Sequence, residues 1–182
     1  MYNFNMNFLM ILVISLVFFV LIFVLLFEFT GLLGAPYIPS SAKDIDIAFT
    51  KLYSLSKNDL LVDLGSGDGK VLRSAEEKGA RVIGVEINPI LVLFSKLKYS
   101  GVKNICIYCS DMYKFKLPKE TTVVYVYGNA HVVKRIYNQL LNESKRLGKK
   151  LYLITNAFDC KNVTSVKHIA PYYLYEIKSL DW

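Results

Sequence analysis

The chain has 182 residues, enough for one domain of ordinary size and little besides. Its hydrophobic fraction of 53% is high for a soluble domain, but the excess is concentrated in the first tenth of the sequence. The net charge of +7 favours an anionic membrane surface, a nucleic acid or an acidic protein as partner, without deciding among them. Three cysteines are too few for a disulfide framework, which agrees with a reducing compartment.

The first element in chain order is an apolar run from Phe8 to Phe27, in which Ser15 is the only polar residue. Because about 20 apolar residues suffice to cross a bilayer as a helix, we expect a single-pass transmembrane helix over 8–27. A cleavable signal peptide is the alternative, but it would carry a basic segment and a shorter apolar core. No Lys or Arg precedes Phe8, and a helix apolar on every face does not fit the core of so small a domain.

All 22 Lys and Arg follow this run, and positively charged segments tend to stay on the cytoplasmic side of a membrane. We therefore expect a membrane protein whose remaining part faces the cytoplasm. Glycines and prolines punctuate the next stretch, so residues 28–39 are interpreted as a linker and residues 40–182 as the globular domain.

From Leu60 onward, short apolar runs alternate with helical patterns, which is typical of parallel βαβ units. The tail, with Pro171 followed by YYLYEIKSL, predicts a terminal hairpin with an antiparallel last strand. The expected fold is therefore α/β, a doubly wound and mostly parallel sheet. The expected strands are 60–65, 81–86, 104–109, 121–127, 150–156 and 172–180, and the expected helices are 42–55, 69–78, 89–100 and 130–147.

Cys106 and Cys109 form a C-x-x-C pattern inside one of these expected strands. Residues three apart on a strand point to opposite faces of the sheet, so the two thiols do not converge on an ion. We expect no metal site.

The strongest motif is LLVDLGSGDGK at 60–70, an apolar strand that runs into three glycines and then into a helix. Glycine permits a tight turn and lets a ligand approach the backbone without a Cβ in the way. A small polar or anionic ligand group is expected at the start of the helix, where free N–H groups point outward. Taken alone, a glycine-rich loop is weakly specific.

Acidic residues close three consecutive expected strands. Asp63 stands inside the first strand and requires a cationic or donor-rich partner; the alternative is a carboxylate that caps the amides of its own loop. Glu86 ends the second strand at the position from which a carboxylate binds ribose hydroxyls, with a contact to the following helix start at Asn88 as the alternative. Asp111 ends the third and is placed to face an adenine amino group. The three side chains should converge on the crevice where open α/β sheets bind ligands.

The patterns D-L-G-S-G-D-G at 63–69, V-E-I-N-P at 85–89 and S-D-M at 110–112 together resemble the class I S-adenosylmethionine-dependent methyltransferases. The resemblance covers roughly residues 36–156 and implies a Rossmann-like fold with S-adenosyl-L-methionine as cofactor. It implies that the loop and Asp63 bind the methionine part, Glu86 the ribose diol, and Asp111 the adenine. The residues that it assigns to the cofactor are Asp63, Gly65, Ser66, Gly67, Gly69, Glu86, Asn88, Asp111 and Met112.

The segment PYIPSS at 36–41, read with the same motifs, resembles a group of small protein-lysine methyltransferases. That group includes membrane-anchored mitochondrial enzymes that modify the adenine nucleotide translocase and the ATP synthase c-ring protein, and soluble archaeal relatives. The segment folds over the cofactor in the group, which adds Tyr37 and Pro39 as candidates; a membrane-interface anchor is the alternative for Tyr37. The resemblance implies a protein substrate, possibly a membrane protein, reached from a bilayer contact through residues 8–27.

The fourth expected strand ends in VVYVYGNAH at 123–131, where the acceptor should meet the methyl group. It lacks the [ND]-P-P-[YF] sequence of methyltransferases that act on bases or glutamine, so we expect no nucleic-acid partner. Tyr127 and Asn129 are the candidate catalytic residues, whereas a core role is the alternative for Tyr125. His131 and His168 are interpreted as structural.

A lysine acceptor must lose its proton, although its usual pKa is about 10.4. Desolvation in an aromatic-walled slot lowers that pKa, and positioning of the two reactants then supplies much of the catalysis without a dedicated acid or base. Two other functions stay open at this point. One is methylation of a small molecule or lipid, and the other is a noncatalytic cofactor-binding or scaffolding module.

Overall fold

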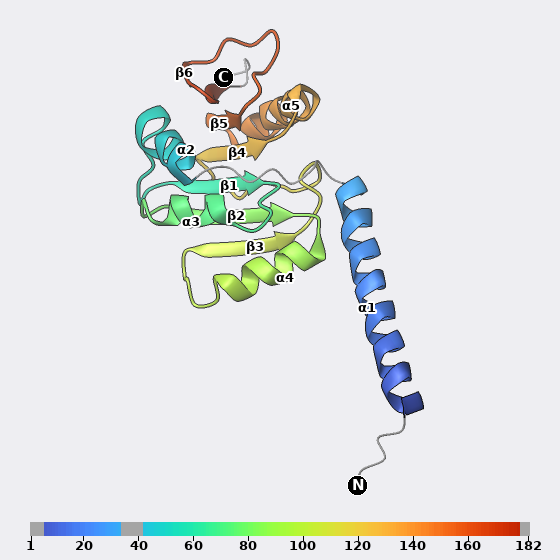
Figure 1. The fold of residues 1–182 in the computed structure, drawn as a ribbon. Helices are drawn as coiled ribbons and strands as arrows, with labels where there is room; N and C mark the ends of the chain where they lie inside the picture. The colour runs from blue at the N-terminus through green and yellow to red at the C-terminus, as the bar shows by residue number, and fades with distance from the viewer. Residues whose placement is uncertain (1–5, 34–41, 179–182) are drawn as a thin grey trace. The chain divides into compact units, whose positions relative to one another are not determined.

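The computed structural model describes residues 6–33 and 42–178. The chain divides into two compact units, residues 1–37 and 38–182, and Figure 1 shows both as ribbons. The predicted linker falls at this division. Its residues 34–39 lie outside the described residues, as do Tyr37 and Pro39.

The first unit contains one helix, α1 (Met6–Leu33). The large apolar side chains from Phe8 to Val24 are exposed. In the part of the chain that the structure describes, no helix combines the length and the apolar character needed to cross a membrane, so the predicted transmembrane helix is not confirmed. The helix also continues to Leu33, into the predicted linker, because residues 28–33 contain no proline and one glycine only weakens a helix.

The second unit is built on a seven-stranded sheet in the order β3-β2-β1-β4-β5-β7-β6. β1 to β5 run parallel, while β7 pairs antiparallel with both β5 and β6. This confirms the predicted mostly parallel, Rossmann-like sheet with an antiparallel C-terminal strand and hairpin. The strands are β1 (Leu60–Leu64), β2 (Arg81–Glu86), β3 (Ile105–Cys109), β4 (Val123–Tyr127), β5 (Leu151–Asn156), β6 (Lys167–Ile169) and β7 (Tyr172–Ile177).

Helices cover both faces of this sheet, as the doubly wound pattern predicts. α2 (Ala42–Ile47), the π-helical turn η1 (Ala48–Leu52), α3 (Lys70–Glu76) and α4 (Pro89–Lys98) pack on one face; α5 (Ala130–Leu147) packs on the other. The helix predicted over 42–55 ends early, because Tyr53 is extended and its hydroxyl donates to the carboxylate of Asp59 at 2.9 Å.

β1 lies in the middle of the sheet, and all five of its residues are buried. A strand covered on both faces is normally apolar throughout, so Asp63 is the exception in LLVDL. Asp63 points to the face that carries Leu61, η1 and α3, and it stands opposite Gly84 of β2 and Tyr125 of β4. The fold therefore places a carboxyl at the carboxyl end of the central strand, where open α/β sheets bind ligands.

Candidate functional site

The loop between β1 and α3 turns through three glycines in the left-handed region, with φ of 95° at Gly65, 54° at Gly67 and 78° at Gly69. The backbone N–H groups of Gly65 and Ser66 both donate to the carbonyl of Val85, at 2.8 and 3.0 Å. The loop is therefore closed against the end of β2. A Cβ at Gly65 would meet nothing within 4 Å, so open space lies beside its Cα.

The outward amides predicted for this loop are largely occupied by the protein itself. Gly67 N–H donates to Oε2 of Glu86 at 2.9 Å, and Gly69 N–H donates to the carbonyl of Ser66 at 2.9 Å. The expectation of an anionic ligand group at these amides is wrong, because the parallel register brings the end of β2 alongside the loop. A ligand must approach the glycines from the open side of Gly65.

Asp63 is 2% exposed, and its carboxyl accepts no hydrogen bond from any residue that the structure describes. Burial raises its pKa well above the usual range, and the negative charges of Glu86 and Asp68 raise it further. The alternative role, a cap for the amides of its own loop, is not observed. A buried carboxyl without a donor is costly, and a cationic ligand group would relieve that cost.

Glu86 is buried and uses both carboxylate oxygens within the protein. Oε2 accepts from Gly67 N–H, and Oε1 accepts from Asn88 N–H at 2.8 Å. The contact with the helix start that we considered as an alternative is thus present. It leaves room for a ligand, because each carboxylate oxygen has two acceptor sites. Asn88 itself caps α4, with its Oδ1 accepting from Ile90 N–H at 2.9 Å.

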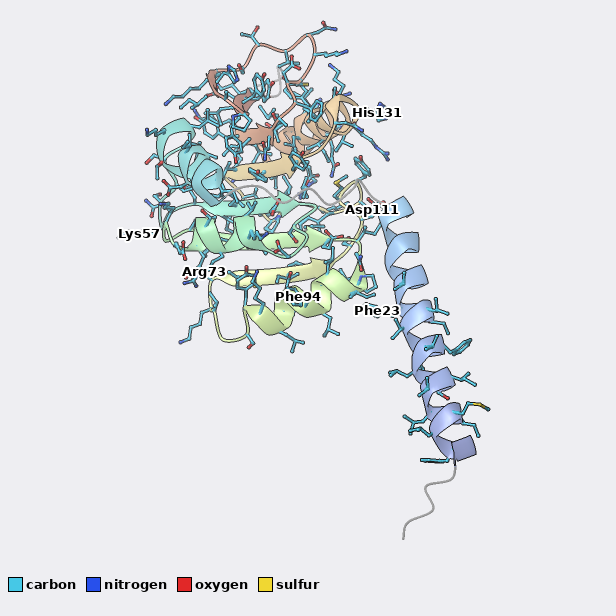
Figure 2. All side chains as sticks on the ribbon, in the orientation of Figure 1. Phe23, Lys57, Arg73, Phe94, Asp111 and His131 are labelled. Carbon is cyan, nitrogen blue, oxygen red and sulfur yellow. The ribbon has the colours of Figure 1, made fainter. Side chains whose placement is uncertain are left out.

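Asp111 and Met112 follow β3 and are half-buried. Ser110 N–H donates to the carbonyl of Glu86 at 2.9 Å, which holds this segment beside the end of β2. Asp111 Oδ1 accepts from Tyr113 N–H at 2.9 Å, and the Met112 carbonyl accepts from the Gln139 side chain at 3.1 Å. Asp111, labelled in Figure 2, therefore lies at the same edge of the sheet as Glu86.

The two candidate catalytic residues follow β4, which pairs with β1. Tyr127 is half-buried and packs against the core cluster that contains Tyr125. Asn129 is exposed and caps α5, because its Oδ1 accepts from His131 N–H at 3.1 Å and from Val132 N–H at 3.0 Å. The capping role accounts for Asn129 without catalysis, and both catalytic assignments stay predictions. Tyr125 is a core residue, 1% exposed.

Three residues that sequence reasoning missed support the loop. The buried Ser95 Oγ donates to the carbonyl of Gly67 at 2.9 Å. Tyr99 lies against Gly69, where a Cβ would come within 2.5 Å of its ring. Ser95 and Tyr99 share the buried face of α4 with Val92, so a polar residue on an apolar helix face was the available signal.

Gly84 of β2 is the third supporting position. A Cβ there would lie 2.6 Å from Leu72 Cδ1, 2.7 Å from Ser66 Oγ and 3.0 Å from Ser66 Cβ. We expect Gly84→Ala to lower the free energy of unfolding by about 1–3 kcal/mol, measured by urea denaturation, because the loop and α3 must both shift. Adding Ser66→Gly removes two of the three close contacts and should recover part of the loss. Full stability in the single variant would contradict this close packing.

Comparison with known proteins decides the family. The model of the ANTKMT methyltransferase domain matches residues 63–167, more than half of the chain. The chain belongs to this methyltransferase family. The resemblance to methyltransferases of the adenine nucleotide translocase and ATP synthase type is thereby confirmed.

Curated relatives agree with the family. The human lysine N-methyltransferase of the ATP synthase c-ring protein is 31% identical over 111 residues, covering 59% of this chain and 46% of that protein. The mouse adenine nucleotide translocase lysine N-methyltransferase is 32% identical over 89 residues, covering 47% of this chain and 38% of that protein. The chain therefore spans about half the length, or less, of the curated relatives it matches.

A solved structure also resembles the domain closely. The RNA methyltransferase from Salinibacter ruber, in complex with S-adenosyl-L-homocysteine, has a TM-score of 0.67 and is 25% identical to this chain. The match covers 78% of this chain and 94% of that chain. The methyltransferase fold is thus confirmed over the globular domain.

Proposed function

We propose that this chain is an S-adenosylmethionine-dependent methyltransferase that transfers methyl groups to lysine side chains of proteins. The observation that carries the proposal is the buried carboxyl of Asp63, which has no donor among the described residues and stands below the open side of Gly65. The family match supports the reaction class, and the lysine N-methyltransferases among the relatives support the acceptor.

The residues at this edge suit the chemical groups of the cofactor. The Asp63 carboxyl would hold the cationic amino group, and the missing Cβ of Gly65 admits the methionine chain. Ser66 Oγ is buried with no hydrogen-bond partner among the described residues, so a polar cofactor atom would satisfy it. Glu86 would accept from the ribose hydroxyls, and Asp111 with Met112 would border the adenine. When bound, the cofactor supplies an electrophilic methyl group on a positively charged sulfur.

The acceptor side is proposed at the end of β4. A lysine amine attacks only in its neutral form, and an apolar wall favours that form because it disfavours the ammonium. Tyr127 is the half-buried aromatic residue in the proposed position, and Tyr37 is the second candidate of this kind. Catalysis then rests on the alignment of amine and methyl group, to which Asn129 contributes through the start of α5.

The membrane contact is part of the same proposal. Residues 8–27 form an almost wholly apolar run, their described side chains from Phe8 to Val24 are exposed, and every Lys and Arg follows the run. We propose that this segment contacts a lipid bilayer and that the catalytic domain faces the cytoplasm. Recovery of the full chain in the soluble fraction, or protection of the domain from a protease added to the cytoplasmic side, would contradict this placement.

A methyl-transfer assay tests the proposed reaction. The purified chain is incubated with cofactor labelled in the methyl group and with a membrane-protein extract, and methylated lysine is identified by mass spectrometry. We expect label on lysine that disappears with Asp63→Asn. Label confined to the lipid or small-molecule fraction would favour the alternative acceptor, and label in RNA would follow the Salinibacter neighbour. Cofactor binding without any labelled product would favour a noncatalytic module.

A further inference from the structure

The outer side of α4 carries an exposed apolar surface. Leu93, Phe94 and Leu97 are 61%, 55% and 67% exposed, and Ile87, just before the helix, is 44% exposed. These four residues are called the α4 face below, and Figure 2 labels Phe94 on it. The opposite side of α4 already packs into the core through Val92, so the α4 face has no structural role within the domain.

Lysines flank the α4 face on both sides. With 3.6 residues per turn, Leu93, Leu97 and Phe94 span an arc of about 100°, with Lys96 beyond one edge and Lys98 beyond the other. Both lysines are exposed, and Lys98 Nζ lies 5.9 Å from the centroid of the Phe94 ring. An apolar stripe between two long cationic side chains matches the boundary between acyl chains and headgroups, because lysine stems lie along apolar surface while the ammonium groups reach polar groups.

The charge around the α4 face has one sign. The segment 87–110 contains Lys96, Lys98 and Lys103 but no Asp or Glu. An acidic neighbour of this segment is Asp68 of the glycine loop, whose carboxylate lies 3.8 Å from Lys98 Nζ and 3.6 Å from Lys70 Nζ. The surface therefore complements a negatively charged layer over its whole length.

A second copy of the chain fits this surface poorly. In a twofold interface the same residues meet their own copies, so the flanking lysines would face like charges. A stable dimer also buries about 800 Å² on each partner, more than one side of a ten-residue helix offers. An anionic lipid surface meets neither obstacle.

We propose that the α4 face docks the globular domain onto an anionic lipid bilayer, with Leu93, Phe94 and Leu97 at the acyl boundary and Lys96 and Lys98 at the headgroups. α4 begins at the carboxyl edge of the sheet, where Asn88 and Glu86 lie. Docking through it therefore holds the candidate site close to the lipid surface. The proposal needs neither methyl transfer nor a lysine acceptor to be correct.

Site-directed fluorescence on the full chain tests this docking. In a background with Cys106→Ser and Cys109→Ser, an environment-sensitive dye is attached at Leu93→Cys, and a matched dye at Asn138→Cys on α5 serves as control. Both positions are exposed in the structure, so labelling should not disturb the fold. The proteins are reconstituted in vesicles of phosphatidylcholine alone or of phosphatidylcholine with phosphatidylglycerol, with or without a spin-labelled lipid as quencher.

The dye at position 93 should shift to shorter wavelength and be quenched by the spin-labelled lipid in vesicles with phosphatidylglycerol. The dye at position 138 should report water in both. Because any contact made by residues 8–27 is present in both vesicle types, a difference between them isolates the domain surface. Lys96→Gln with Lys103→Gln should abolish the shift. Equal water exposure of both dyes in anionic vesicles would overturn the proposal, and so would a shift that follows protein concentration, which would indicate a second copy.

Discussion

Asp63→Asn is expected to weaken S-adenosylmethionine binding by about 100-fold or more while raising the melting temperature of the free chain at neutral pH. The binding loss follows because removing one partner of a buried charge pair costs about 2–5 kcal/mol. The stability gain follows because the wild-type carboxyl is buried without a donor and close to Glu86 and Asp68. Calorimetric titration and thermal melts measure the two effects separately.

The stability gain has a defined pH dependence. Because the pKa of Asp63 is higher in the folded chain than its ordinary value of 3.8, the folded state keeps a proton that the unfolded state releases. The wild type therefore loses stability as pH rises from that ordinary value through the folded pKa. Asparagine does not titrate, so the advantage of the variant should grow over this range and vanish at lower pH.

The exposed Asp159 provides the matched control for this pair of effects. Asp159→Asn removes a carboxylate of the same kind and should leave cofactor affinity unchanged. Unchanged affinity in Asp63→Asn would show that the buried carboxyl lies outside the cofactor site. A melting-temperature gain that does not depend on pH would contradict the buried, partnerless carboxyl.

Glu86→Gln is expected to lower both stability and cofactor affinity, in contrast to Asp63→Asn. Both carboxylate oxygens accept backbone N–H groups, from Gly67 and Asn88, and a glutamine side chain offers only one oxygen. One of the two buried N–H groups must then face a donor, at a cost of about 1–3 kcal/mol. Because Gly67 belongs to the cofactor loop, we expect affinity to fall by more than about 10-fold, including the lost contact with the ribose.

Asn88→Ala separates the two parts of that effect. It removes the side-chain cap of α4, at a cost of about 1 kcal/mol, but keeps the backbone N–H that donates to Glu86. Chemical denaturation should show a smaller loss of stability than in Glu86→Gln, and calorimetry should show the smaller loss of affinity. Equal losses of affinity in the two variants would indicate that Glu86 acts only through α4 and does not contact the cofactor.

The carboxylates around the glycine loop select the charge of the ligand. Asp63, Glu86 and Asp68 are close enough that each of the last two raises the pKa of the first. This acidic site belongs to a chain with a net charge of +7, so it differs in sign from the molecule as a whole. A cofactor with a cationic sulfur and amino group is favoured here, whereas the basic α4 face is suited to anions.

The sequence by itself determined the elements of this fold and the edge at which they meet. Apolar runs at periods of two and of 3.6 depend only on neighbouring residues, so strands and helices of the globular domain were predicted close to their observed positions. Asp63, Glu86 and Asp111 were placed at the carboxyl edge for the same reason, because each ends or nearly ends a strand. The antiparallel last strand also followed from local alternation and Pro171.

Only the tertiary structure decided how these residues are used. That Val85 and Glu86 occupy the amides of the glycine loop depends on the register between β1 and β2, whose residues are about 20 positions apart in the chain. The support of Gly67 by Ser95 likewise joins distant segments. No local pattern records such contacts, because the free energy that fixes them comes from packing two strands and a helix together. The exposure of Leu93 and Leu97 was decided in the same way, since α4 has apolar residues on both sides and only the sheet chooses which side is buried.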